Sequence, residues 1–203
     1  MKYYPEITLL PNAEANLGFL WEKVYHQIHL ALVENKTANG ESEIGISFPG
    51  YKLECKKDFF PLGSKLRLFS KTEESLIKIN FEKWTEKLID YCNLSTIEKV
   101  PENISQYALF KRIQLKTNAI RLAKRRAKRK GVTLEKALEY YSDFKDSESS
   151  LPYINTVSLS SIKRNRFRLF ILHELVEIPF SGNFNCYGLS SKEEHKQAVV
   201  PWF

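Results

Sequence analysis

The segment KRIQLKTNAIRLAKRRAKRK, residues 111–130, determines how the rest of the chain is interpreted. It contains ten Lys or Arg and no Asp or Glu, whereas the remainder has 21 basic and 24 acidic residues. The net charge of +7 therefore comes from this segment and not from the surface as a whole. Such a local excess of positive charge favours a polyanionic partner, and nucleic acid is the natural candidate.

Within this segment the sequence predicts a helix over residues 119–130. Asn118 is a favourable N-cap, most of the following residues are strong helix formers, and Gly131 suits the C′ position. The alternatives are a solvated, disordered run and a membrane-surface helix; the end signals oppose the first, and the lack of Trp and Phe opposes the second. Residues three and four apart share a helix face, and five basic residues, which we call the basic stripe, have this spacing: Arg121, Lys124, Arg125, Lys128 and Arg129.

Length and composition limit the remaining possibilities. A chain of 203 residues that is 43% hydrophobic can form one large domain or two small ones. No apolar run approaches the roughly 18 residues of a membrane span, and the N-terminus lacks a signal-peptide core. Cys55, Cys92 and Cys186 are odd in number and far apart, which is typical of a reduced, cytoplasmic protein without a zinc cluster. The four histidines form no metal-binding motif, so we expect no metal, no cofactor and no membrane association.

Hydrophobic periodicity predicts an α+β fold. The N-terminal part has the order β-α-β-β-α-β of a ferredoxin-like (RRM-like) domain over residues 1–100. Residues 101–203 are expected to form a C-terminal α/β domain that contains the arginine-rich RNA-binding helix and a small sheet. Besides that helix, the predicted helices span residues 13–35, 72–88 and 133–144, and the predicted strands span residues 3–10, 44–48, 65–69, 90–100, 107–115, 153–159, 167–173 and 184–187.

Few residues stand out as candidates for catalysis from pattern alone. His29 lies on the first predicted helix, and His26 is equally plausible on that basis. Ser158 and Ser160 belong to the sequence Ser-Leu-Ser at the end of a predicted strand, and Tyr187 precedes a glycine. Each of these residues by itself is a weak signal.

Six fragments taken together are far more specific. They are IHLALV (28–33), IGISFP (44–49), RIQLKTN (112–118), FRLFI (167–171), CYGLS (186–190) and VPWF (200–203). In this order, and around an arginine-rich helix, the chain resembles the CRISPR repeat-cleaving endoribonuclease of subtype I-F, which makes guide RNAs.

The resemblance implies a metal-independent endoribonuclease without cofactors. It would bind the stem-loop of CRISPR repeat RNA, cleave at the 3′ base of the stem by 2′-OH attack, and leave a 2′,3′-cyclic phosphate on the mature crRNA. The family stays bound to its product and works with the other subunits of the type I-F effector complex. The alternatives are a hairpin-RNA-binding subunit of such a complex that does not cleave and, from the helix alone, a basic DNA-binding regulator.

The resemblance also assigns catalytic roles. By its position in the motif, His29 resembles the catalytic histidine of the family. An ordinary pKa near 6.5 suits proton transfer at neutral pH, as general base or general acid. Ser158 matches the serine that positions the 2′-OH, and Tyr187 matches the residue that orients the imidazole. Counting back from Phe167 would instead place that serine at Ser160; we prefer Ser158 because the two extra residues then fall in a loop.

RNA binding is assigned in the same way. Arg112 and Gln114, two apart on one predicted strand, resemble the pair that reads base edges near the bottom of the stem. Phe167 resembles the aromatic residue that stacks on the terminal base pair. The basic stripe resembles the helix that enters the major groove of the hairpin, although Lys124 and Lys128 stand where the family more often has Arg.

Overall fold

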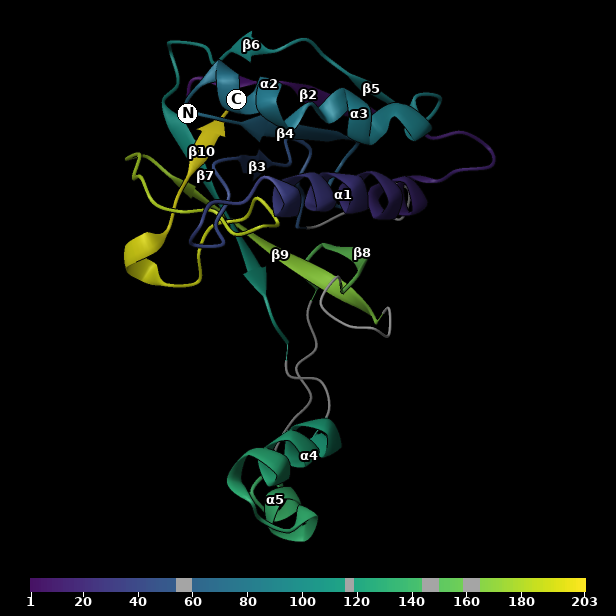
Figure 1. Cartoon of the computed structure of the whole chain (residues 1–203), viewed down its shortest axis with the longest axis vertical. Helices are drawn as coiled ribbons and strands as arrows, with labels where there is room; N and C mark the ends of the chain where they lie inside the picture. The colour runs from purple at the N-terminus through teal and green to yellow at the C-terminus, as the bar shows by residue number, and fades with distance from the viewer. Residues whose placement is uncertain (54–59, 116–118, 144–149, 159–164) are drawn as a thin grey trace. The chain divides into compact units, whose positions relative to one another are not determined.

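The computed structural model describes residues 1–53, 60–115, 119–143, 150–158 and 165–203 (Figure 1). Its contacts divide the chain into two compact units, one formed by residues 1–113 and 151–203 and the other by residues 114–150. In these described ranges, no helix has the length and apolar character needed to cross a membrane.

A four-stranded antiparallel sheet forms the N-terminal part of the first unit. Its strand order is β3-β4-β2-β5, and the chain passes through β-α-β-β-α-β in agreement with the sequence prediction. Pro5 divides the first predicted strand, and β1 pairs separately with β6. The elements in chain order are β1 (Tyr3–Tyr4), β2 (Glu6–Leu9), α1 (Leu17–Glu34), β3 (Gly45–Ser47), β4 (Lys65–Phe69), α2 (Glu73–Ile79), α3 (Phe81–Thr85), the 3-10 helix η1 (Glu86–Leu88), β5 (Cys92–Leu94) and β6 (Glu98–Lys99).

Helix α1 covers this sheet and carries His29. Asn16 caps its N-terminus, because the side-chain oxygen accepts a hydrogen bond from the Phe19 N–H at 3.0 Å. The helix ends at Asn35, whose N–H still reaches the Ala31 carbonyl. Its buried face consists of Leu20, Trp21, Val24, Tyr25, Ile28, His29, Ala31 and Leu32, so the imidazole belongs to the core-facing side of an amphipathic helix.

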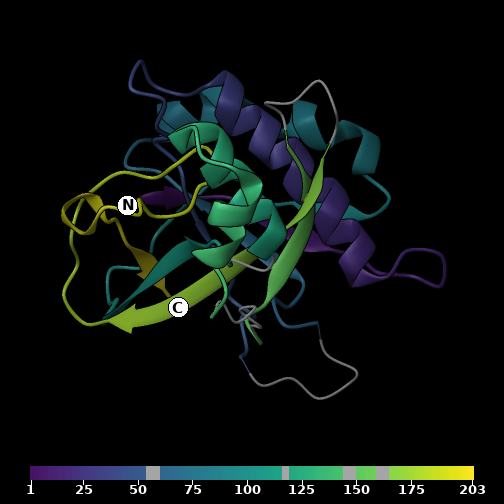
Figure 2. The same ribbon diagram turned by 90° about the horizontal axis from the view of Figure 1, so that it is seen from below.

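A second antiparallel sheet has the order β10-β7-β9-β8. Its strands are β7 (Gln106–Ile113), β8 (Tyr153–Val157), β9 (Arg166–Val176) and β10 (Val200–Trp202), with the 3-10 helix η2 (Glu194–Lys196) before the last strand. Both views show β8 running beside α1 (Figures 1 and 2). This sheet and helix α1 therefore flank the region where the candidate residues lie.

The strand predicted over residues 184–187 is wrong. Phe184 makes isolated bridges to Ser42 and Ser190, and residues 185–188 form a tight turn. Gly188 has a φ of 68°, and a Cβ there would lie 2.4 Å from the side chain of Ile46. A strand cannot continue through a residue that must adopt this backbone conformation.

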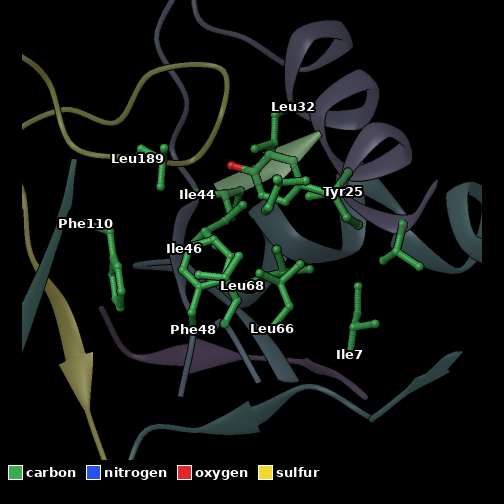
Figure 3. Packing of buried hydrophobic residues seen from close by; sticks show 14 of the residues in the cluster. Ile7, Tyr25, Leu32, Ile44, Ile46, Phe48, Leu66, Leu68, Phe110 and Leu189 are labelled. Carbon is green, nitrogen blue, oxygen red and sulfur yellow. The ribbon is translucent and has the colours of Figure 1, made fainter. Parts of the chain in front are cut away.

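One hydrophobic cluster joins the two sheets (Figure 3). Tyr25 and Leu32 from α1 meet Ile46 of β3 and Phe48, which follows that strand. Phe110 from β7 lies with its ring centroid 5.3 Å from that of Phe48. The contacts thus group the chain differently from the predicted division at residue 101, because β7 and the C-terminal strands share the core of the N-terminal sheet.

The second unit contains the predicted basic helix. Helix α4 (Ala119–Lys130) has the predicted bounds, Gly131 has a φ of 65°, and the proposed N-cap Asn118 lies outside the described residues. Helix α5 (Leu134–Glu139) is shorter than predicted and is capped by Thr133. The two helices pack through Ala123 and Ala137, both fully buried, and the Arg126 guanidinium lies 3.6 Å from the ring centroid of Tyr140.

The helix predicted over residues 72–88 is interrupted at Asn80. Asn80 has a φ of 52°, its backbone closes α2, and its side-chain oxygen accepts from the Lys83 N–H at the start of α3. One residue therefore ends one helix and caps the next, which helical spacing cannot reveal. The strand predicted over residues 90–100 is also wrong as a single element, because β5 pairs with β2 while β6 pairs with β1.

We expect Asn80→Ala to lower the free energy of unfolding by roughly 1–3 kcal/mol. Ala is strained in the left-handed backbone conformation, and it has no side-chain oxygen to cap α3. Asn80→Gly keeps the positive φ at low cost and should be less destabilising. Urea denaturation of both variants checks this. Equal stability of the two variants would show that the backbone conformation at this position is not the determining factor.

Candidate active site and RNA-binding residues

His29 is held by a backbone carbonyl from the far end of the chain. Its Nδ1 lies 2.7 Å from the Cys186 oxygen. A carbonyl can only accept a hydrogen bond, so Nδ1 donates and Nε2 of the neutral ring carries the lone pair. Burial lowers the pKa of His29, and the charges of His26 and Arg112 lower it further, while the bond to Cys186 opposes the shift. The imidazole is therefore neutral at pH 7, with a basic Nε2.

Tyr187 lies flat against this imidazole. The two ring centroids are 4.0 Å apart and the planes differ by 8°. The turn holds Tyr187 in place, because its N–H donates to the Asn185 side chain at 2.8 Å and the Gly188 N–H donates to the Asn185 carbonyl at 2.8 Å. The sequence-predicted pairing of His29 with Tyr187 is thus a direct stacking contact.

A second bond from α1 fixes the same turn. The Tyr25 hydroxyl donates to the Tyr187 carbonyl at 2.8 Å. Tyr25 and His29 are four residues apart and so share one helix face, and they bind two consecutive carbonyls, those of Tyr187 and Cys186. Sequence reasoning missed Tyr25 because a buried tyrosine on an amphipathic helix is indistinguishable from an ordinary core residue.

Arg112 extends the stack. Its guanidinium lies 5.1 Å from the Tyr187 ring centroid and 4.9 Å from that of Phe167. The order His29, Tyr187, Arg112, Phe167 forms a column from α1, the 185–188 turn, β7 and β9. Burial raises the pKa of Tyr187, and Arg112 acts in the opposite direction. Four of the sequence-predicted residues are therefore brought together.

Ser158 and Gln114 are not members of this column. Ser158 directly follows β8, is half-buried, and its N–H donates to the Asn165 carbonyl at 3.0 Å. It lies on the segment packed beside α1 and outside the stacked column. Ser160 lies outside the described residues. Gln114 is exposed and follows the last residue of β7, so the prediction that it shares a strand with Arg112 is wrong.

All five residues of the basic stripe are exposed on α4. The buried and half-buried residues of that helix, among them Ala123 and Arg126, lie on the other side, toward α5. The segregation that the sequence predicts is therefore present within the second unit. Arg126, which has no predicted role, is used to stack on Tyr140.

Possible metal ligands are scattered. Within the described ranges, no three His, Cys, Asp or Glu side chains gather closely enough to hold a metal ion. Cys92 is buried and Cys186 is half-buried, while Cys55 lies outside these ranges.

Comparison with known proteins gives consistent matches over the whole length. Residues 4–203 match the family described as CRISPR-associated protein (Cas_Csy4). The chain is 34% identical to the CRISPR-associated endonuclease Cas6/Csy4 of Escherichia coli (strain UTI89 / UPEC), over all of both chains. It is 31% identical to the protein of the same name from Pseudomonas aeruginosa (strain UCBPP-PA14), also over all of both chains.

Similarity to solved structures is weaker. A structure described as "An RAMP protein binding different RNA substrates" covers all of both chains at 13% identity with a TM-score of 0.33. This value is too low to assign the fold.

The unfolding free energy should be highest above pH 6.5. Because burial lowers the pKa of His29 in the folded state, the unfolded chain binds a proton more readily, and stability falls as the pH decreases through 6.5 toward the folded-state pKa. Burial lowers the pKa of His173 too, which adds to the same fall.

His29→Gln cannot titrate and should reduce this pH dependence, as urea unfolding at pH 7.5, 6.5 and 5.5 would reveal. The wild type, unfolded at the same three pH values, is the reference. An undiminished pH dependence in His29→Gln would contradict a buried neutral imidazole at this position.

Proposed function

Because the chain belongs to the family of CRISPR-associated proteins described as Cas_Csy4, we propose that it is an endoribonuclease that binds the stem-loop of CRISPR repeat RNA and cleaves at the 3′ base of the stem. The single observation that carries this proposal is the His29 imidazole, which the Cys186 carbonyl and the Tyr187 ring hold with Nε2 as the basic nitrogen.

The proposed reaction is a metal-independent transesterification. Nε2 of His29 takes the proton of the 2′-OH, the 2′-oxygen attacks the adjacent phosphorus, and the bond to the 5′-oxygen of the next nucleotide breaks. The products are a 2′,3′-cyclic phosphate and a 5′-OH, and the proton on the imidazolium returns to the leaving oxygen. Bonds, protons and electrons therefore balance in this step without a cofactor.

Two observations support the base role of His29 in the first step. The bond to Cys186 places the proton on Nδ1, and burial keeps the ring neutral at pH 7. A preorganised neutral imidazole can accept a proton without first losing one. His29 is only 5% exposed, so productive binding requires the RNA to fit closely against the remaining open edge or to displace a neighbouring side chain.

Tyr187 and Ser158 have positioning roles in this proposal. Tyr187 restricts rotation of the imidazole by stacking on it. Ser158 is assigned the 2′-OH, which it would hold in line for attack; its support is the resemblance and its place beside α1. Ser160 is assigned a contact to the RNA on the resemblance alone.

RNA recognition is assigned to two sets of residues. Arg112, Gln114 and Phe167 would contact the bottom of the stem, with Arg112 and Gln114 on base edges and Phe167 on the terminal base pair. The exposed basic stripe would contact the phosphates and the major groove of the hairpin. We further propose that the protein stays bound to the cleaved RNA and joins the other subunits of a type I-F effector complex.

His29→Ala should bind the repeat hairpin normally and cleave it at least 100-fold more slowly, since general acid–base catalysis is worth roughly 10²–10⁴ in rate. The wild type should cleave in EDTA but should leave RNA with a 2′-deoxyribose at the cut site intact. Gel assays of cleavage and filter binding check these points. A requirement for Mg²⁺, or cleavage of the deoxy RNA, would exclude the mechanism, and binding without any cleavage would identify a non-cleaving hairpin-binding subunit.

The basic stripe should make hairpin binding strongly dependent on salt. If five side chains neutralise phosphates, the plot of log K against log salt concentration has a slope of about −4, and replacing one of them with Ala reduces its magnitude by nearly 1. Lys124→Ala is the test variant, and Lys78→Ala on α2 of the other unit is the control. A wild-type slope near zero would mean that the stripe does not contact RNA.

A further inference from the structure

A cavity of about 260 Å³ lies between α1 and β8, one helical turn from the candidate catalytic histidine. His26 lines this cavity and precedes His29 by three residues, so the two side chains are neighbours on the helix surface. The cavity therefore lies beside the proposed reaction centre. Its remaining lining residues are Glu22, Lys23, Thr156, Val157 and Arg166.

Thr156 has a buried hydroxyl without a partner in the part of the chain that the structure describes. The residue is 1% exposed, and its Oγ1 makes no hydrogen bond to any described residue. An unpaired buried hydroxyl is costly, and a native structure usually satisfies it or reserves it for a ligand. Thr156 lies in β8, two residues before Ser158, which directly follows that strand.

The lining indicates what kind of group fits. Glu22 can only accept hydrogen bonds, Arg166 can only donate them, and the two lie 3.5 Å apart, while Thr156 can do both. Because Lys23 and Arg166 lie beside Glu22, the lining carries both signs of charge, and a neutral base offers the donors and acceptors that such a lining can bind. The volume is below the roughly 300–1,000 Å³ of typical small-molecule sites, so the cavity suits one nucleoside and not a longer stretch of RNA.

We propose that this cavity binds the base of the nucleoside immediately 3′ of the cut, the one whose 5′-oxygen leaves, and that the Thr156 hydroxyl hydrogen-bonds to that base. The inference rests on the proposed function, in which cleavage occurs at the 3′ base of the stem. The nucleoside before the cut is then base-paired, whereas the one after it is unpaired and can turn out of the helix into a pocket. Binding there would hold the leaving group next to His29.

The test uses Thr156→Val, which replaces the hydroxyl with a methyl group of similar size, and Thr156→Ser, which keeps the hydroxyl. Three repeat hairpins are compared in single-turnover cleavage: an unmodified RNA, one that is abasic immediately 3′ of the cut, and one that is abasic immediately 5′ of the hairpin. The denaturation midpoint of Thr156→Val should equal or exceed that of the wild type, because the hydroxyl has no partner to lose.

Thr156→Val should cleave the unmodified RNA and the 5′-abasic RNA about three- to tenfold more slowly than the wild type, as expected for one lost hydrogen bond. On the 3′-abasic RNA, which already lacks the partner, the variant and the wild type should be equally slow. Thr156→Ser should resemble the wild type throughout.

An equal effect of Thr156→Val on all three RNAs, or no effect on any, would overturn the inference. Loss of the effect on the 5′-abasic RNA alone would assign the cavity to the other flank and would also overturn it. A wild type that cleaves the 3′-abasic RNA at full rate refutes only this inference, whereas a wild type that cleaves none of the RNAs refutes the proposed function.

Discussion

Two hydrogen bonds to consecutive carbonyls hold the candidate active site together. Tyr25 and His29, one turn apart on α1, bind the carbonyls of Tyr187 and Cys186, which lie about 160 residues later in the sequence. Both bonds are largely shielded from water, where an unmade partner is costly. The turn that carries Tyr187 is consequently tied to the helix that carries the imidazole, and the stack of the two rings follows from this constraint.

The same constraint determines the chemistry available to the imidazole. A carbonyl on Nδ1 selects one tautomer, and burial beneath Tyr187 favours the neutral ring. Arg112 contributes in two ways, because its positive charge also lowers the pKa of His29 and its guanidinium lies between the rings of Tyr187 and Phe167. Arg112, which is assigned to nucleobase recognition, therefore contacts Tyr187, the residue that stacks on the proposed general base His29. This contact couples RNA binding to the geometry of the reaction centre.

Positive charge is organised separately from this centre. The basic stripe belongs to a unit of two short helices, residues 114–150, whose small interface is built from Ala123, Ala137 and the contact of Arg126 with Tyr140. Such a small unit buries little apolar surface of its own. Electrostatic attraction to RNA is non-directional and tolerates this arrangement, whereas proton transfer requires the close packing found around His29.

The sequence by itself determined the elements that depend on local physics. The basic helix over residues 119–130, the β4 strand over residues 65–69 and the β-α-β-β-α-β order follow from caps, spacing and alternation, and the family resemblance singled out His29 and Tyr187. Only the tertiary structure decided that helices α2 and α3 separate at Asn80, that residues 185–188 form a turn, and that β7 joins the N-terminal core. It alone showed that Tyr25 and the Cys186 carbonyl hold the candidate site together, and that the Thr156 hydroxyl has no hydrogen-bond partner among the described residues. These features depend on contacts between residues far apart in the chain, and no local pattern encodes which carbonyl a buried side chain will reach.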